Sequence, residues 1–286
     1  MISDITLGQF FPGYSILHRL DQRTKIILTV LFIASVFVSD NPVSFIALLF
    51  FTVLLVITGR ISIKVILKGL KPLIFILIFT SLLNVFMTVG TGQPLFEFYF
   101  IKVYNEGIIR AVFMSLRVIL LIIGSSMLLT YTTSPISLTD GIESLLSPLK
   151  LVGLPVHSFA MMMSIALRFI PTLVEETEKI MNAQKSRGAD FSSGGLIKRA
   201  RALIPLLVPL FVSAFKRADE LACAMECRCY RGDKNRTKLV KLSYKPRDFF
   251  VIVLFVLLLG SIITLKILPY QFEVNSLFYD VIFYKI

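Results

Sequence analysis

The sequence has few of the side chains that usually carry enzyme chemistry. His18 and His157 are its only histidines among 286 residues, and they lie far apart in the chain. It contains no Gly-x-x-x-x-Gly-Lys-Ser/Thr phosphate loop, no Gly-x-Ser-x-Gly turn for a serine nucleophile and no His-Glu-x-x-His zinc pair. We therefore expect a protein without a catalytic site, which does not hydrolyse ATP through a phosphate loop.

Cysteine is also scarce, and its distribution argues against a metal site. The three cysteines are Cys223, Cys227 and Cys229. On a helix, Cys223 and Cys227 share one face, but no fourth ligand lies nearby to complete a tetrahedral site. We expect half-buried, reduced thiols, and we expect neither a metal nor a cofactor.

Acidic residues are absent from the interior of the long apolar runs. Hydrophobic residues make up 56% of the chain, its mean hydropathy is +0.81 and its net charge is +12. This hydropathy is too high for an ordinary soluble domain. The lack of intramembrane acids disfavours proton or sodium coupling. Aromatic residues do not alternate with the basic ones, which disfavours nucleic-acid binding.

The apolar runs predict an all-α, polytopic membrane bundle with about five spans. We expect these spans at 26–38, 43–58, 72–88, 107–131 and 249–268. The first two read as a tight helical hairpin. The basic residues after the second span, around Lys64 and Lys68, predict a loop with an interfacial helix.

The charges predict which side of the membrane each segment occupies. Basic residues predominate in 132–246, whereas acids predominate in the segments that we expect outside, namely 39–42, 89–106 and 269–286. Arg19, Arg23 and Lys25 precede the first apolar run. By the positive-inside rule, these charges place the N-terminus in the cytoplasm of a multi-pass membrane protein.

Two arginines interrupt the fourth apolar run. Arg110 and Arg117 lie seven residues apart and share one helical face. A charge within a span is costly and often functional. We favour a structural interpretation, in which Arg110 extends to the outer surface and Arg117 packs toward the bundle, over a role in transport.

The long polar stretch, 132–246, is expected to contain a short amphipathic helix at 137–149 and two long ones at 156–187 and 196–230. These two helices would lie beneath the membrane spans on the cytoplasmic side. The chain then divides into an N-terminal segment with four spans (1–131), the cytoplasmic helix region (132–246), and the last span with its outer tail (247–286).

Prolines and a glycine mark the expected ends and bends of the two long helices. Pro171 is expected to kink the first, and Pro205 and Pro209 to bend or interrupt the second. Gly188 is a stop signal for the first helix.

Each long helix ends in an arginine-centred tripeptide, Ser186-Arg187-Gly188 and Cys227-Arg228-Cys229. An arginine near a helix C-terminus interacts favourably with the helix dipole, which is one explanation for each. The guanidinium also offers five donors in a fixed fork that suits a carboxylate-lined surface. Because the two tripeptides have matched settings on a membrane protein, we favour docking onto a soluble partner.

These tripeptides, the second within Ala224–Tyr230, resemble the paired coupling motifs of the transmembrane T component of energy-coupling factor (ECF) transporters. The opening Gly8-Gln9-Phe10 and the run His18–Lys25 are similar to the N-terminal segment of that family. Ser186 stands where the family often has Ala, and Cys227 and Cys229 flank Arg228 where Ala and Gly are common. The arginines themselves are retained.

The resemblance implies a non-catalytic subunit in a prokaryotic plasma membrane. It implies assembly with two ABC-type ATPases, one for each of Arg187 and Arg228, and with a substrate-binding S component for a vitamin or another micronutrient. Several interchangeable S components would be able to use the same chain. Met repacks readily against different partners, so we expect the S-component surface around Met161, Met162, Met163, Leu206 and Leu207. The alternative, that these residues face lipid or the core of the bundle, stays open.

Two other classes of protein remain open at this point. A stand-alone secondary transporter or channel would need an ion pathway through the bundle. A basic membrane anchor would bind anionic lipid by the number of its charges rather than by their positions.

Overall fold

The computed structural model describes residues 10–88, 96–98, 101–189, 191, 195–230, 232 and 242–267. The opening Gly8-Gln9 pair and the expected outer tail at 269–286 lie outside the described residues. The chain divides into two compact units. We call one the bundle unit, which contains residues 10–134 and the chain from Leu242 onward, and the other the helix-pair unit, Pro135–Lys241.

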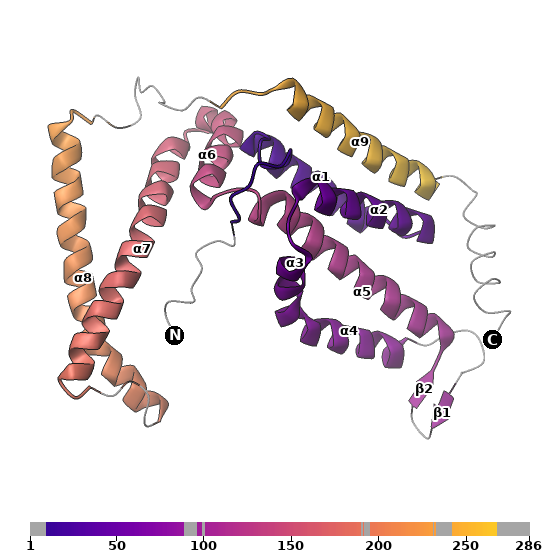
Figure 1. The fold of residues 1–286 in the computed structure, drawn as a ribbon, viewed down its shortest axis with the longest axis horizontal. Coiled ribbons are helices and arrows are strands. Elements are labelled where there is room, and N and C mark those ends of the chain that lie inside the picture. Colours follow the sequence, from indigo (N-terminus) through magenta and orange to yellow (C-terminus); the bar gives the residue numbers. More distant parts are fainter. Residues whose placement is uncertain are drawn as a thin grey trace. The chain divides into compact units, whose positions relative to one another are not determined.

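The bundle unit is built almost entirely of helices (Figure 1). In chain order its elements are α1 (Gln22–Val38), α2 (Pro42–Gly59), α3 (Ile63–Leu70), the short 3-10 turn η1 (Lys71–Leu73), α4 (Ile74–Met87), strands β1 (Phe96–Phe98) and β2 (Ile101–Val103), α5 (Asn105–Ser125) with its π-helical end η2 (Ser126–Thr130), and α9 (Pro246–Ile267).

The predicted hairpin of the first two apolar runs is confirmed as α1 and α2. Asp21 caps α1, because its side chain accepts a hydrogen bond from the backbone N–H of Arg23 at 3.0 Å. Pro42 opens α2 at a first-turn position, where a helix leaves the backbone N–H unpaired in any case. A helix, α3, is also present where the sequence predicts an interfacial helix.

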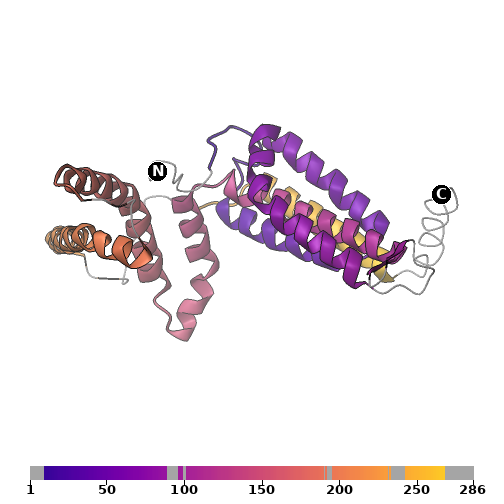
Figure 2. The same ribbon diagram turned by 90° about the horizontal axis from the view of Figure 1, so that it is seen from below.

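The core of the bundle unit is apolar and rich in phenylalanine. Phe32 on α1 is fully buried against Gly124 of α5, where an added Cβ would overlap the phenyl ring. Phe51 of α2 and Phe255 of α9 meet edge to face, with ring centroids 4.7 Å apart. α1 therefore packs against α2, α5 and α9, and Figure 2 shows the helices of this unit running side by side.

Five helical stretches among the described residues are long and apolar enough to cross a membrane, as predicted. They are α2, α3 with α4 (Ile63–Met87), α5 with η2 (Asn105–Thr130), α7 (Val156–Ser186) and α9. The five helices are not all the predicted ones: α7 is included although we did not predict it as a span, and α1 is not included although we did. With 17 residues, α1 is about 25 Å long, which is short of a bilayer core.

The segment between α4 and α5, which falls in the stretch that we expected outside the membrane, contains a small β-hairpin. β1 and β2 pair antiparallel, with Phe96 opposite Val103 and Phe98 opposite Ile101. Aromatic and β-branched residues favour this extended conformation. The hairpin leaves the predicted all-α class intact, because each strand has three residues.

The helix-pair unit contains α6 (Pro135–Leu145), the 3-10 turn η3 (Ser147–Val152), α7 (Val156–Ser186) and α8 (Leu196–Cys227). The two long helices therefore begin where predicted and end within three residues of the predicted positions. α8 continues through Pro205 and Pro209, so the expectation of an interruption is wrong. In Figure 1 the first turns of α8 run at an angle to the rest of the helix, which agrees with the alternative expectation of a bend.

Candidate functional site

The end of α7 is closed by a Schellman motif around Arg187. The backbone N–H of Gly188 donates to the carbonyl of Lys185 at 2.9 Å, and that of Ala189 donates to the carbonyl of Gln184 at 3.0 Å. Gly188 has a φ of 86°, in the left-handed region that this motif requires after the C-cap. Arg187 is the C-cap residue, and Gly188 is the stop signal predicted from the sequence.

The end of α8 repeats the same arrangement around Arg228. The N–H of Cys229 donates to the carbonyl of Glu226 at 2.8 Å, and the N–H of Tyr230 to the carbonyl of Met225 at 3.0 Å. Cys229 takes the left-handed position with a φ of 57°. Arg228 is therefore the C-cap residue and is equivalent to Arg187, although the sequence places Cys where the first motif has Gly.

Both C-cap arginines project from exposed positions. Arg187 and Arg228 are exposed, and among the described residues neither forms an ion pair. Because each arginine is a C-cap residue, its positive charge is favoured by the partial negative charge of a helix C-terminus and is not paired with a carboxylate of the described residues. These two groups therefore remain able to bind carboxylates of another molecule.

α7 and α8 pack against each other and run in opposite directions (Figure 1). Arg217 of α8 and Glu176 of α7 form an ion pair with a distance of 2.7 Å between Nη2 and Oε2. Arg187 and Arg228 therefore lie at opposite ends of the helix pair. The two arginines are not brought together into one site; they form two separate tips.

A groove of about 400 Å³ lies between the two helices. Small side chains of α8 face larger ones of α7 across it, and Met225 and Tyr230 of the α8 capping motif form part of its lining. The lining residues are Ile165, Phe169, Leu173, Ala214, Arg217, Ala218, Leu221, Ala222, Met225, Glu226 and Tyr230.

The three cysteines lie on or next to the last turns of α8. Cys223, Cys227 and Cys229 are all free and exposed, so the expectation of half-buried thiols is wrong. Among the described residues, no group of three potential metal-ligating side chains comes together.

The residues predicted to contact an S component differ in exposure. Met162, Met163 and Leu207 are exposed at 58%, 41% and 46%, and Met161 is partly buried, whereas Leu206 is only 5% exposed. The apolar exposure on α8 extends well beyond Leu207. It also includes Leu203, Ile204, Val208, Phe211, Val212 and Phe215.

A buried polar cluster that the sequence analysis missed joins α1, η2 and α9 at one end of the bundle unit. Lys25 is 2% exposed, and its Nζ donates to the carbonyl of Thr132 at 2.8 Å. Asp248 is 1% exposed and accepts hydrogen bonds from the N–H groups of Asp21 at 2.9 Å and Lys245 at 2.7 Å. We call these residues the Lys25 cluster.

Lys25 lies just before the apolar run at 26–38. Burial of its side chain lowers the pKa of the ammonium group to about 8. The carboxylates of Asp21 and Asp248 act in the opposite direction. Desolvation outweighs this attraction, because a charge loses most of its hydration when it is enclosed by protein. The chain leaves the bundle unit after Ser134 and re-enters it at Leu242. The Lys25 cluster lies close to these two points in the chain and holds the N-terminal ends of α1 and α9 together there.

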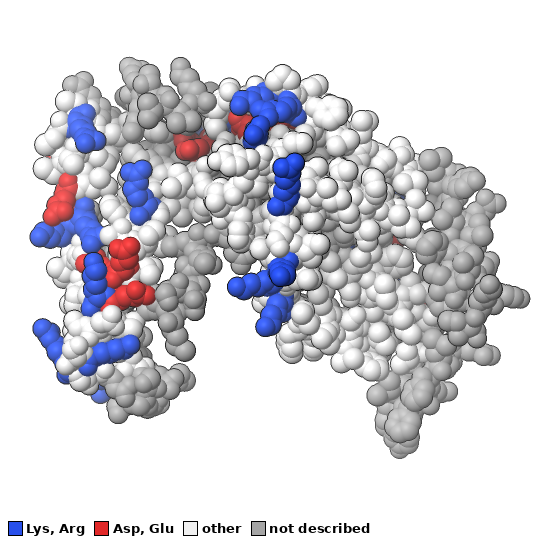
Figure 3. All heavy atoms as spheres, viewed as in Figure 1, with Lys and Arg blue, Asp and Glu red and all other residues white. Residues whose placement is uncertain are grey.

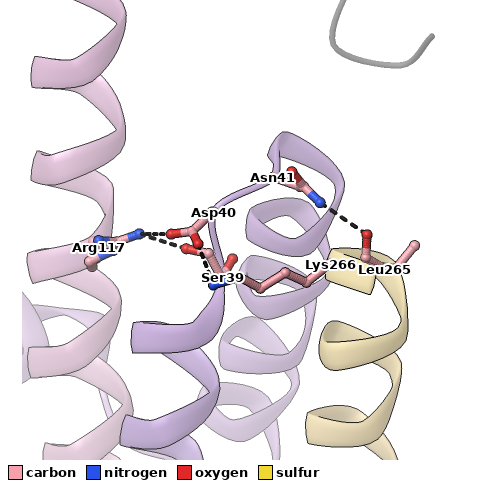
Figure 4. Close-up of polar contacts among 6 residues, drawn as sticks. All are labelled: Ser39, Asp40, Asn41, Arg117, Leu265 and Lys266. Carbon is pink, nitrogen blue, oxygen red and sulfur yellow. Dashed lines mark hydrogen bonds and ion pairs between the residues drawn. The ribbon is translucent and has the colours of Figure 1, made fainter. Parts of the chain in front are cut away.

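The other end of the bundle unit is held by a clamp around Asp40 (Figure 4). Nη2 of Arg117 donates to the carbonyl of Ser39 at 2.6 Å and lies 3.3 Å from Oδ1 of Asp40. Nζ of Lys266 lies 2.7 Å from Oδ2 of Asp40, so α9 is held to the same turn. The bundle-facing position expected for Arg117 is therefore confirmed.

Comparison of the sequence with known proteins shows the family of the chain. The model of the cobalt transport protein family, CbiQ, matches residues 13–239. The chain is 53% identical over 249 residues to the "energy-coupling factor transporter transmembrane protein EcfT" of Clostridium kluyveri, covering 87% of this chain and 92% of that protein. It is 49% identical to the protein of the same name from Bacillus subtilis, covering 93% of this chain and all of that protein. Because the family model and these two relatives each match most of its length, the chain belongs to the CbiQ/EcfT family.

Proposed function

We propose that this chain is the energy-coupling transmembrane subunit of an ECF-type importer. In this role it passes the ATP-driven motion of two ABC-type ATPase subunits to a separate S component that binds a vitamin or another micronutrient. The chain itself carries out no catalysis. The observation that carries the proposal is the matched position of Arg187 and Arg228 at the C-caps of α7 and α8.

The geometry of the helix pair suits two partners of the same kind. Because α7 and α8 run in opposite directions, their tips are separated, and each tip is able to engage a different ATPase subunit. The two identical backbone motifs present the arginines in the same way, as expected if the two ATPases offer similar grooves. Arg187 and Arg228 would bind there through charge-assisted hydrogen bonds.

The exposed apolar face of α8, with Met162 and Met163 of α7, is the proposed S-component surface. An exposed apolar patch, such as the one that Leu203, Leu207 and Phe211 form along α8, is typical of an interaction surface. The flexible Met side chains suit interchangeable S components. Leu206 is omitted from this surface because it is buried.

Co-purification tests the ATPase part of the proposal. The tagged chain is purified in mild detergent from its own host, and its partners are identified by mass spectrometry. We expect two ABC-type ATPases and small membrane proteins with the wild type, and loss of the ATPases from Arg187→Glu/Arg228→Glu. The matched control is Arg168→Glu/Arg201→Glu, which makes the same charge change on exposed residues within α7 and α8.

A chain that purifies alone in every form would overturn the proposal. Substrate transport by the chain alone in liposomes, without ATP, would instead support a stand-alone transporter or channel. A second variant, Leu207→Lys/Phe211→Lys, separates the two surfaces. It should lose the small membrane proteins and keep the ATPases.

The proposed topology has both tips and the N-terminus in the cytoplasm. The three exposed cysteines beside the α8 tip provide a direct probe. A membrane-impermeant maleimide should label the chain in inside-out vesicles and not in intact cells. Labelling in intact cells would mean that the α8 tip faces outward, opposite to the proposed topology.

A further inference from the structure

One side of α3 is packed against the end of α5. Ile66 is 7% exposed and forms an apolar cluster with Met127 and Tyr131. An added Cβ at Gly69 would lie 2.7 Å from the Tyr131 hydroxyl. Ile66 and Gly69 are three residues apart and lie on the same helical face. α3 therefore rests on the bundle with this face and leaves the rest of its surface open.

The open surface of α3 is divided into a basic stripe and an apolar stripe. Lys64, Lys68 and Lys71 follow the spacing i, i+4, i+7, and all three are exposed. Ile63 and Leu67 are 66% and 59% exposed and form the neighbouring stripe. A short helix with this division of charge and apolar surface is suited to lie in the plane of a membrane interface.

The positive charge of this surface is not neutralised within the described residues. Arg60, exposed at the turn before α3, adds a fourth positive charge, and among the described residues no acid pairs with any of the four. The sequence contains no Asp or Glu between Asp40 and Glu97. In Figure 3 the blue spheres over α3 and the turn before it have no red sphere beside them.

The element after α3 indicates what covers the surface. α4 follows through η1, and none of its residues is buried, although it is strongly apolar. Such a helix is stable in contact with lipid chains. α3 therefore lies where the hydrocarbon layer begins, with Ile63 and Leu67 on the side of the acyl chains and the lysines at the level of the headgroups.

We propose that the basic stripe Arg60, Lys64, Lys68 and Lys71 binds the headgroups of anionic phospholipids, such as phosphatidylglycerol, in the leaflet that faces this end of the bundle unit. The negative headgroups supply the charge that the protein lacks here, and the neighbouring apolar stripe anchors the helix beside them. This interaction does not depend on the proposed partners at α7 and α8.

The absence of tryptophan from the chain permits a specific fluorescence test. The full chain with Leu67→Trp is placed in phosphatidylcholine bilayers that contain a fixed fraction of phosphatidylglycerol. Bromine, which quenches tryptophan, is attached either to the phosphatidylglycerol or to an equal amount of phosphatidylcholine. Ile63→Trp is a second reporter on the same stripe, in case the first disturbs folding.

We expect brominated phosphatidylglycerol to quench more strongly than brominated phosphatidylcholine, because the lysines concentrate it around α3. Each lysine near an anionic surface should contribute about a fivefold preference. In Lys64→Gln/Lys68→Gln/Lys71→Gln the preference should fall to about the fivefold that Arg60 alone supplies. The control Lys150→Gln/Lys179→Gln/Lys185→Gln removes the same charge from exposed positions in the helix-pair unit and should keep the preference.

Two results would overturn this proposal. One is equal quenching by the two brominated lipids in the otherwise wild-type chain. The other is an equal loss of preference in both triple variants, because total charge rather than the α3 stripe would then attract the lipid.

Discussion

Arg187 and Arg228 occupy the same position in two copies of one backbone motif, 41 residues apart in the chain. In each copy the residue after the arginine is left-handed and donates to the carbonyl three residues before it, and the next residue donates to the carbonyl five before it. The main difference lies in the left-handed residue, which is Gly188 in one motif and Cys229 in the other. Because the left-handed residue differs, substitutions at Gly188 and Cys229 test the backbone conformation of each tip separately.

Cys229→Gly should stabilise the end of α8. A non-glycine residue in the left-handed region costs about 1 kcal/mol, which glycine avoids. Hydrogen exchange at the amide of Tyr230 should slow by about fivefold in this variant. Gly188→Ala is the converse change and should destabilise the end of α7. Nothing lies within 4 Å of the added Cβ, but the φ of 86° disfavours any side chain. Faster exchange in Cys229→Gly would contradict the assignment of strain to Cys229.

Replacement of the tip arginines by lysine tests whether the shape of the guanidinium is needed. Lysine keeps the charge but lacks the planar fork for two parallel hydrogen bonds. We expect Arg187→Lys/Arg228→Lys to impair ATP-driven uptake while the amount of chain in the membrane stays normal. Arg168→Lys/Arg201→Lys is the matched control. Normal uptake in the tip variant would indicate that the tips act only as points of positive charge.

Arg117→Met should lower the stability of the bundle unit without abolishing coupling. The change removes the donor to the Ser39 carbonyl and one partner of Asp40. Because Asp40 is about half exposed, solvent screens the ion pair, and the total loss should be about 1 kcal/mol. Thermal unfolding in detergent measures this loss. A variant that unfolds normally but transports no substrate would assign Arg117 a direct role in transport.

The Lys25 cluster predicts a stability that rises with pH. The pKa of Lys25 is about 8 in the folded chain, against 10.5 for a free lysine. Between these values the unfolded chain binds a proton that the folded chain does not, so the free energy of unfolding increases as the pH rises from 8 to 10.5. The gain should reach about 3 kcal/mol at most.

Denaturant titration of the wild type beside Lys25→Met measures this effect. The methionine variant should lack the component that Lys25 contributes, so the difference between the two chains should grow with pH across this window. A constant difference would mean that Lys25 titrates as an ordinary lysine.

Features set by neighbouring residues were predictable from the sequence. The long helices α7 and α8 followed from apolar periodicity, and Gly188 marked the end of α7 because glycine favours the left-handed position. Cys229 in the same position was not foreseen, since cysteine has no preference for it. The prolines Pro205 and Pro209 predicted a bend or an interruption of α8, and the helix continues through both.

Contacts between distant parts of the chain were beyond the reach of local patterns. Asp21 and Asp248 are separated by 227 positions, and their hydrogen bond depends on how α1 and α9 pack. Nothing in the spacing of polar residues distinguishes Asp248 from an acid at the surface of a helix start. The clamp between Arg117 and Asp40 was foreseen only in part, because the sequence predicted that Arg117 packs toward the bundle but gave no sign of its contact with Asp40.

The central claim is that each tip binds its own ATPase subunit, and cross-linking tests it most directly. In a chain without native cysteines, a single cysteine is placed beside one arginine, as Ser186→Cys or by restoring Cys227, and the assembled complex is treated with a short thiol cross-linker. We predict that both positions cross-link to ATPase subunits. Arg187→Glu should abolish the link from position 186 and Arg228→Glu the link from position 227, because loss of a buried charged contact costs about 2–5 kcal/mol. ATPases that co-purify with the chain but cross-link to neither tip would contradict the account.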